Sequence, residues 1–115
     1  GINAPATLLH LPNGGLLHPA HWGTVALAIK EGVAVMAAKQ LIPAWDPYLF
    51  TRTVCEKTKE NLNSMLQDIQ AGRPTEIEAL NGRIEREGRA LAIATPVNAA
   101  LTKLIRSLEP LQRPL

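Results

Sequence analysis

The sequence predicts an all-α domain, on two observations of composition and one of pattern. Apolar residues make up 46% of the 115-residue chain but aromatic residues only 3%, so Leu, Ile, Val and Ala have to fill the interior. Apolar residues recur at steps of three and four, as on one face of a helix, and no segment shows the period of two that a half-buried strand requires. The length suits a single core. We therefore expect one compact multi-helix domain over residues 1–115.

The N-terminal half predicts three helices separated by turns. The opening GINAPATLLHL is apolar and reads as a helix entered part-way, and PNGG at Pro12–Gly15 is a strong turn signal. A long helix is expected from about Pro19 to Gln40. Asp46 followed by Pro47 is typical of a helix start, which places the next helix from Pro47 to about Leu62. The expected apolar face of the long helix consists of Val25, Ile29, Val33 and Met36.

The stretch NSMLQDIQAGRPTEIEALNG, residues 63–82, contains two capping patterns. Ser64 with Gln67, and Thr75 with Glu78, have the three-residue spacing of a capping box. In that motif the side chain of each residue of the pair accepts a hydrogen bond from the backbone N–H of the other, at the start of a helix. A short helix is thus expected from Asn63 and Ser64, and another from Thr75. Gly72 and Pro74 between them supply the stop. The apolar stripe expected after Thr75 is Ile77, Leu80, Ile84 and Leu91, and that of a last helix from Thr95 and Pro96 is Val97, Leu101, Leu104, Ile105 and Leu108.

Two polar residues of this stretch are not needed for packing. Glu76 falls at the first position of the predicted helix, and Asn81 falls one turn after Ile77 on the buried side. A carboxylate in a first turn stabilises the helix by about 0.3–1 kcal/mol through the helix dipole. The pattern therefore leaves Glu76 open as either a solvated helix start or a site residue, and leaves the role of Asn81 undecided.

Charge and side-chain chemistry argue against several classes of function. The net charge of +2 is spread along the chain without basic runs interleaved with aromatic residues, so nucleic-acid binding is not expected. Cys55 is the only cysteine, which excludes an intrachain disulfide and fits a reducing compartment. We expect it to be a core or half-buried thiol and not a nucleophile. His10, His18 and His21 have no nearby acidic partners, and we expect capping or surface histidines and no metal site. No apolar segment is long enough to span a membrane, so the chain reads as a soluble, cytoplasmic protein.

Three segments together resemble ketopantoate reductase. They are INAPATLLHLPNGGLL near the N-terminus, NLNSMLQDIQAGRPTEIEALNG in the middle and TPVNAAL near the end. The resemblance runs from Ile2 to about Leu108 and concerns the C-terminal domain of that enzyme. It implies the helical fold of that domain, of the type found in the C-terminal part of 6-phosphogluconate dehydrogenase.

The resemblance also implies an activity and a division of labour. Ketopantoate reductase, or 2-dehydropantoate 2-reductase, is an oxidoreductase that reduces ketopantoate to pantoate with NADPH, a step toward pantothenate and coenzyme A. An N-terminal Rossmann domain holds the NADP cofactor, and the helical domain supplies most substrate contacts. This sequence has no glycine-rich GxGxxG turn after a strand. We therefore expect the C-terminal substrate domain alone, with the Rossmann domain absent.

Site residues follow from the same resemblance. Ser64 matches a serine that binds the substrate carboxylate, and Glu76 matches an acid near the nicotinamide end of the cofactor that orients the catalytic lysine. The asparagines expected around the substrate are Asn3, Asn13 and Asn61. Hydroxyl and amide groups suit a ketoacid, whose oxygen atoms require donors in fixed positions. Departures from the family pattern are Asn63, where a second serine is usual, and Glu78, where aspartate is common.

The catalytic lysine of the family is expected about two helical turns before Asn3, and none of the lysines in this chain stands in that context. We therefore expect the 115-residue piece to fold but not to catalyse, with a homodimer as a further possibility through its exposed apolar surface. The alternative is a free-standing helical interaction or dimerisation module that kept the fold and lost the chemistry. The sequence does not determine which 2-ketoacid is preferred.

Overall fold

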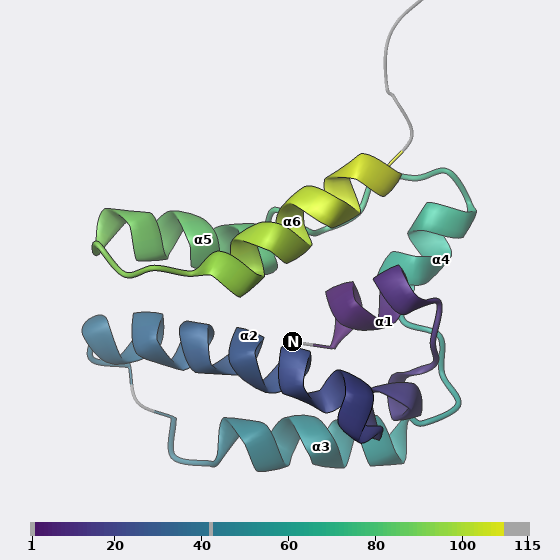
Figure 1. Cartoon of the computed structure of the whole chain (residues 1–115), viewed down its shortest axis with the longest axis horizontal. Helices are drawn as coiled ribbons and strands as arrows, with labels where there is room; N and C mark the ends of the chain where they lie inside the picture. The colour runs from purple at the N-terminus through teal and green to yellow at the C-terminus, as the bar shows by residue number, and fades with distance from the viewer. Residues whose placement is uncertain (1, 42, 110–115) are drawn as a thin grey trace, which may run out of the picture.

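In the computed structural model, which describes residues 2–41 and 43–109, the chain is all-helical, as predicted (Figure 1). Six α-helices and one 3₁₀ helix lie within the described residues. In chain order they are α1 (Asn3–Leu9), the 3₁₀ helix η1 (Asn13–Leu17), α2 (Pro19–Ala38), α3 (Pro47–Lys57), α4 (Ser64–Gln70), α5 (Asn81–Ala90) and α6 (Pro96–Leu108).

The long helix α2 lies in the middle of the molecule. Figure 1 shows α3 on one side of it and the α5–α6 pair on the other, with α1 and α4 gathered at one end. Helix α2 contacts α1, α3, α5, α6 and η1, while α1 packs against both α4 and α6. The segments that carry Asn3, Ser64 and Glu76 are brought together in the core, where Ala4, Met65 and Ile77 share a cluster with Leu101 and Ile105 of α6.

Two clusters of buried side chains form the core. One consists of Ala4, Ala28, Met65, Ile77, Leu101 and Ile105, and the other of Ala6, Leu16, Val25 and Cys55. Alanine at several of these positions lets the helices approach closely. The buried faces are therefore narrower than the sequence predicted: Val25, Leu101 and Ile105 are buried, but Leu104 is 50% exposed and Leu108 42% exposed.

Several predicted helix starts are confirmed, although α4 is capped by a different residue from the one predicted. Asp46 caps α3, where its carboxylate accepts hydrogen bonds from the N–H groups of Tyr48 and Leu49. His18 caps α2 through a bond from the Ala20 N–H. The prediction that Ser64 caps α4 is wrong by one residue, because Asn63 is the cap and accepts from the Leu66 N–H at 2.9 Å.

The predicted helix from Thr75 is also wrong, because α5 begins only at Asn81. A separate turn of residues 76–80 precedes it. The N–H and hydroxyl groups of Thr75 both donate to the carboxylate of Glu109, 34 residues away. Glu78 pairs with Arg86 and Arg106 and so does not return to cap Thr75. Long-range partners thus replace the local capping pattern.

Helix α3 ends at Lys57, five residues before the predicted end. The Thr58 hydroxyl bonds back to the Val54 carbonyl, and the following segment runs alongside η1. There the Gly14 N–H donates to the Lys59 carbonyl, and a Cβ on Gly14 would lie 2.5 Å from the Lys59 Cβ. The glycine in PNGG is therefore needed for close approach, and the predicted turn takes the form of the 3₁₀ helix.

Four helices end in the same way. A residue in the left-handed conformation follows each of them: His10 at φ 54°, Gln40 at φ 59°, Gly72 at φ 71° and Ala92 at φ 58°. In each case the next N–H bonds back to the carbonyl five residues earlier, as from Leu41 to Met36 and from Ile93 to Gly88. This is the Schellman arrangement, in which glycine is preferred, and Gly72 was the one such end that the sequence predicted.

Candidate functional site

Three of the five predicted site residues lie together. Asn3 at the start of α1, Ser64 at the start of α4 and Glu76 before α5 line one small pocket, with Met65, Asp68 and Leu80. Each of the three is followed directly by a buried member of the first core cluster, namely Ala4, Met65 and Ile77. Packing of that cluster therefore brings the three polar residues to a common edge of the domain.

The side chains at this edge are not committed to other parts of the fold. Because Asn63 caps α4, the Ser64 hydroxyl is left without a hydrogen bond to any residue in 2–41 or 43–109, and Ser64 is exposed. Within the same ranges, the side chains of Asn3 and Glu76 likewise form no hydrogen bond or ion pair. One hydroxyl, one amide and one carboxylate are thus available to a ligand.

The pocket itself is small and acidic. Its volume is about 10 Å³, and its lining includes the carboxylates of Asp68 and Glu76 but no Lys or Arg. Arg73 pairs with Asp68 from outside at 3.1 Å. An anionic ligand at this edge would therefore be held by the amide and hydroxyl donors, and a cation would have to come from elsewhere.

The other two predicted site residues have different surroundings. Asn13 is 8% exposed, and its Nδ2 donates to the Thr58 hydroxyl at 2.9 Å. Its backbone N–H donates to the carbonyl of Asn61, whose side chain is exposed. Asn13 and Asn61 are therefore neighbours, but neither lines the pocket of Asn3, Ser64 and Glu76. The Asn13 Oδ1 is buried and has no hydrogen-bond partner among the residues that the structure describes.

Asn63 lies next to the site, and sequence analysis expected it only at the start of the short helix. It is 7% exposed, and its Oδ1 accepts from the Leu66 N–H and from the Thr7 hydroxyl at 3.1 Å. Asn63 thereby attaches the start of α4 to α1. This places Ser64 on α4 relative to Asn3 on α1. The available signal was that asparagine is among the best N-cap residues, ahead of most alternatives at that position.

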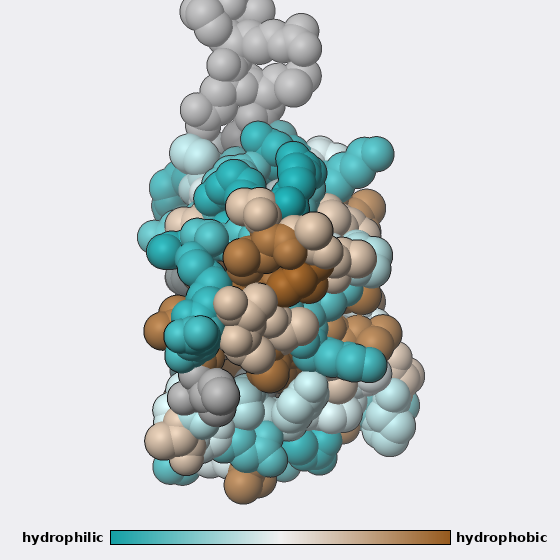
Figure 2. Space-filling view, turned by 90° about the vertical axis from the view of Figure 1, so that its left-hand side faces the viewer, coloured by the Kyte–Doolittle hydropathy of each residue, from teal (hydrophilic) through white to brown (hydrophobic). Residues whose placement is uncertain are grey.

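A larger cavity of about 430 Å³ lies between α2 and α5. Val35, Met36, Leu41 and Ile84 contribute apolar lining, and Leu80 borders both this cavity and the small pocket. Lys39 and Glu87 form an ion pair at 2.7 Å in its lining, and the hydrogen bond from Lys39 lowers the pKa of Glu87 below its ordinary value. Figure 2, which views the end of the molecule at the left of Figure 1, shows apolar side chains gathered between more polar surfaces.

The described residues do not fit a dinucleotide by themselves. The edge formed by Asn3, Ser64 and Glu76 has no Lys or Arg in its lining for the phosphates of a dinucleotide, and Glu76 itself is exposed. Over residues 2–41 and 43–109, no three His, Cys, Asp or Glu side chains are grouped as ligands for a metal ion. In the same part of the chain, no helix combines the length and apolar character needed to cross a membrane.

Comparison with known proteins identifies the family. The model of the ketopantoate reductase PanE/ApbA C-terminal domain matches residues 1–109. The 2-dehydropantoate 2-reductase of Pyrobaculum aerophilum is 37% identical over 111 residues, which cover 96% of this chain and 40% of that protein. The chain thus spans about two fifths of the length of this relative.

Solved structures agree with the sequence comparison. The PanE/ApbA family ketopantoate reductase of Ralstonia eutropha JMP134 superposes with a TM-score of 0.84 at 31% identity, covering 92% of this chain and 36% of that one. D-mandelate dehydrogenase, solved with NADH and anilino(oxo)acetate, gives a TM-score of 0.80 at 27% identity, covering 93% of this chain and 36% of that one. Given the fold, the edge formed by Asn3, Ser64 and Glu76 and these matches, the chain belongs to the family of ketopantoate reductase C-terminal domains.

Proposed function

We propose that this chain is the substrate-binding domain of an NADPH-dependent 2-dehydropantoate 2-reductase, the oxidoreductase that reduces ketopantoate to pantoate for pantothenate and coenzyme A synthesis. Ser64 binds the substrate carboxylate, Asn3 binds the oxygen atoms near the ketone, and Glu76 lies at the nicotinamide end. The observation that carries the proposal is the convergence of these three unengaged side chains at one edge of the domain.

The chemistry of the edge suits a small 2-ketoacid. A hydroxyl and an amide donate hydrogen bonds to carboxylate and carbonyl oxygens without adding charge. The mandelate dehydrogenase relative, solved with the 2-oxo acid anilino(oxo)acetate, supports 2-ketoacids as the substrate class. Asn13 and Asn61 are proposed to contribute from the turn in which the Asn13 N–H donates to the Asn61 carbonyl, where Asn61 is exposed.

The 115-residue chain alone is proposed to bind without catalysing. The edge presents two carboxylates to an anionic substrate and no cation within its own lining, so affinity should be low. Hydride transfer requires the cofactor and the ketoacid to be held next to each other. Correct placement of two reactants accounts for about 7–11 kcal/mol of an activation barrier. A dinucleotide domain would have to supply that placement.

The proposal is tested by titrating the isotopically labelled chain with ketopantoate and following backbone amide signals by NMR. We expect saturable shifts centred on Asn3, Ser64 and Glu76. Ser64→Ala should weaken binding about tenfold, the effect of a lost hydrogen bond to a charged group. Ser107→Ala, which changes an exposed serine on α6, is the matched control and should bind as the unaltered chain does.

Two results would contradict the proposal. Shifts spread over the surface without saturation, or unaffected by Ser64→Ala, would show that the edge is not a ketoacid site. Separately, oxidation of NADPH with ketopantoate should remain at background at high protein concentration. Clear turnover that disappears in Glu76→Ala would refute the claim that the piece alone is inactive.

A second proposal, a helical dimerisation module, is favoured by one observation. The rings of Trp45 and Phe50 pack against each other with centroids 4.8 Å apart, yet both remain more than half exposed, as does Leu49. Exposed apolar side chains grouped in this way are typical of interaction surfaces. Sedimentation velocity separates the two: a module should be dimeric at micromolar concentration and become monomeric in Phe50→Ser, whereas a substrate domain need not associate.

A further inference from the structure

We propose that Asn81 and Asn98 are positioning residues that hold Glu76 in register with Asn3 and Ser64. This inference rests on the proposed function, because it concerns the same edge. Asn81, which the sequence left without a role, is 4% exposed and donates through Nδ2 to the Oδ1 of Asn98 at 2.8 Å. Neither residue lines the pocket, so each would act through the turn that carries Glu76.

Residues 76–82 form one hydrogen-bonded unit. The Glu76 carbonyl accepts from the N–H groups of Ala79 and Leu80, and the Ile77 carbonyl accepts from those of Leu80 and Gly82. These bonds join the turn to the first residues of α5. A displacement of Asn81 would therefore be transmitted to Glu76 through a short, internally bonded segment.

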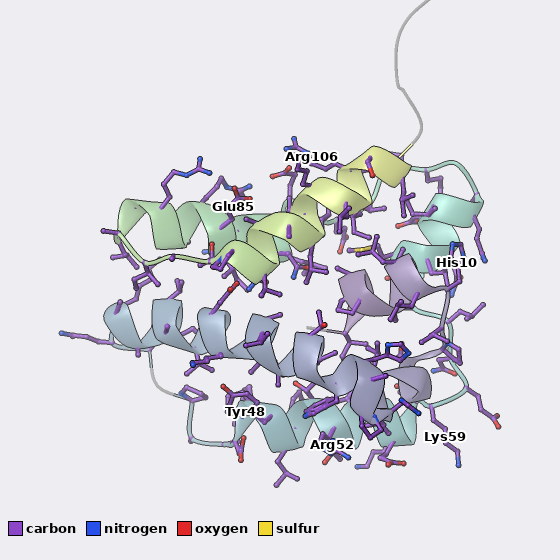
Figure 3. All side chains as sticks on the ribbon, viewed as in Figure 1. His10, Tyr48, Arg52, Lys59, Glu85 and Arg106 are labelled. Atoms are coloured by element: carbon purple, nitrogen blue, oxygen red, sulfur yellow. The ribbon has the colours of Figure 1, made fainter. Side chains whose placement is uncertain are left out.

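This unit and Thr75 just before it are bonded to residues along the length of α6 and just beyond its end. Asn98 near the start of α6 binds Asn81, Arg106 in its last turn pairs with Glu78 at 2.8 Å, and Glu109 just beyond its end accepts from Thr75. Figure 1 shows the chain before α5 passing behind α6, and Figure 3 shows Arg106 on the side of α6 away from α2. The Arg106–Glu78 ion pair and the Glu109–Thr75 hydrogen bonds involve exposed or half-buried residues. Of these three interactions, the Asn81–Asn98 hydrogen bond is the buried one.

Asn98 also connects α6 to α2, whose Ala28 packs with Ala4 and Met65 next to the other two site residues. The Nδ2 of Asn98 donates to the Ala28 carbonyl at 3.0 Å and to the Glu31 carboxylate at 2.8 Å, both on α2. Glu31 also accepts from the N–H groups of Val97 and Asn98, and so caps α6 from outside, in place of Thr95. Asn98 therefore fixes the position of α6 along α2 and at the same time binds Asn81.

The network fixes the relative placement of the site residues. Ala28 belongs to the same core cluster as Ala4 and Met65, which follow Asn3 and Ser64. Apolar contacts have no fixed direction, whereas a buried hydrogen bond between amide groups requires one donor to face one acceptor, and a shift that leaves either group unpaired is unfavourable. The Asn81–Asn98–Ala28 chain thus specifies where Glu76 lies relative to the other two.

The test uses Asn81→Leu, a substitution with the same branching and number of side-chain heavy atoms that removes the bond to Asn98. Asn81→Ser is a smaller second variant should the first fail to fold. The control is Thr102→Val, which removes a buried bond to the Asn98 carbonyl on the same helix and leaves the Asn81–Asn98 bond in place. Hydrogen exchange of the Leu80 and Gly82 amides should accelerate about tenfold in the Asn81 variants relative to α6 amides, but not in the control.

Ketopantoate titration completes the experiment. In the Asn81 variants the ligand-induced shift at the Glu76 amide should fall while the shift at Ser64 is retained; both should persist in Thr102→Val. Unchanged exchange at Leu80 and Gly82, or equal losses at Glu76 and Ser64, would overturn the positioning role. Hydrogen exchange is measured without ligand, so unchanged exchange at Leu80 and Gly82 would leave the ketoacid proposal standing. Absence of ketopantoate binding by the unaltered chain would refute the ketoacid proposal and not the positioning role.

Discussion

Asn63 and Ser64 are adjacent residues of similar chemistry whose roles in the structure differ. Asn63 is buried and caps α4, while the Ser64 hydroxyl faces the pocket edge. We expect Asn63→Ala to lower the free energy of unfolding by about 1–2 kcal/mol, the usual cost of a lost N-cap. Ser64→Ala should change it by less than about 0.5 kcal/mol. Urea denaturation of both variants measures this, and a Ser64→Ala loss as large as that of Asn63→Ala would show that the caps are assigned wrongly.

The Cys55 thiol is a second case in which burial decides chemistry. It is 0% exposed, and burial raises its pKa above the ordinary value of 9.0. The folded state therefore prefers the neutral thiol, so this contribution to stability is present below about pH 9 and is lost as the pH rises through the raised pKa. Because the thiolate is the reactive form, alkylation by iodoacetamide at pH 8 should be at least about tenfold slower in the native chain than in urea. Equal rates would contradict the burial of Cys55.

At the scale of helices, the shared C-terminal arrangement gives a prediction. Ala92 takes the left-handed conformation that costs an L-residue about 1–2 kcal/mol and glycine almost nothing. Ala92→Gly should therefore raise the free energy of unfolding by about 0.5–1 kcal/mol, after the added flexibility of the unfolded chain is subtracted. The reverse substitution, Gly72→Ala, should lower it by a similar amount. Thermal unfolding of the two variants provides the measurement, and changes of the same sign would be inconsistent with this geometry.

Local signals predicted helix ends well where the partners are close in sequence. Asp46 with Pro47 and Gly72 with Pro74 act within a few residues, and both are confirmed. Thr75 satisfied the same local pattern, but Glu109 captures its donors from the far end of α6. Glu31 caps α6 from α2 in a similar way. Such long-range caps depend on how the helices pack, which the spacing of residues in sequence does not contain.

For the whole molecule, residue identity predicted the fold and family, and packing determined the rest. Three segments together, the longest of which contains Ser64 and Glu76, indicated the helical domain that the comparisons confirm. The grouping of Asn3 with these two requires Ala4, Met65 and Ile77 to share one core cluster, and no pattern along the chain specifies that. The same holds for the Asn81–Asn98 bond, whose members are 17 residues apart.

The central claim is that Asn3, Ser64 and Glu76 form one edge that binds a 2-ketoacid. The most direct measurement is a crystal structure of the chain grown with saturating ketopantoate. We predict the ligand carboxylate within hydrogen-bonding distance, about 2.7–3.2 Å, of the Ser64 hydroxyl, with Asn3 and Glu76 around the same molecule. Ketopantoate bound instead in the larger cavity between α2 and α5, with this edge left uncontacted, would contradict the claim.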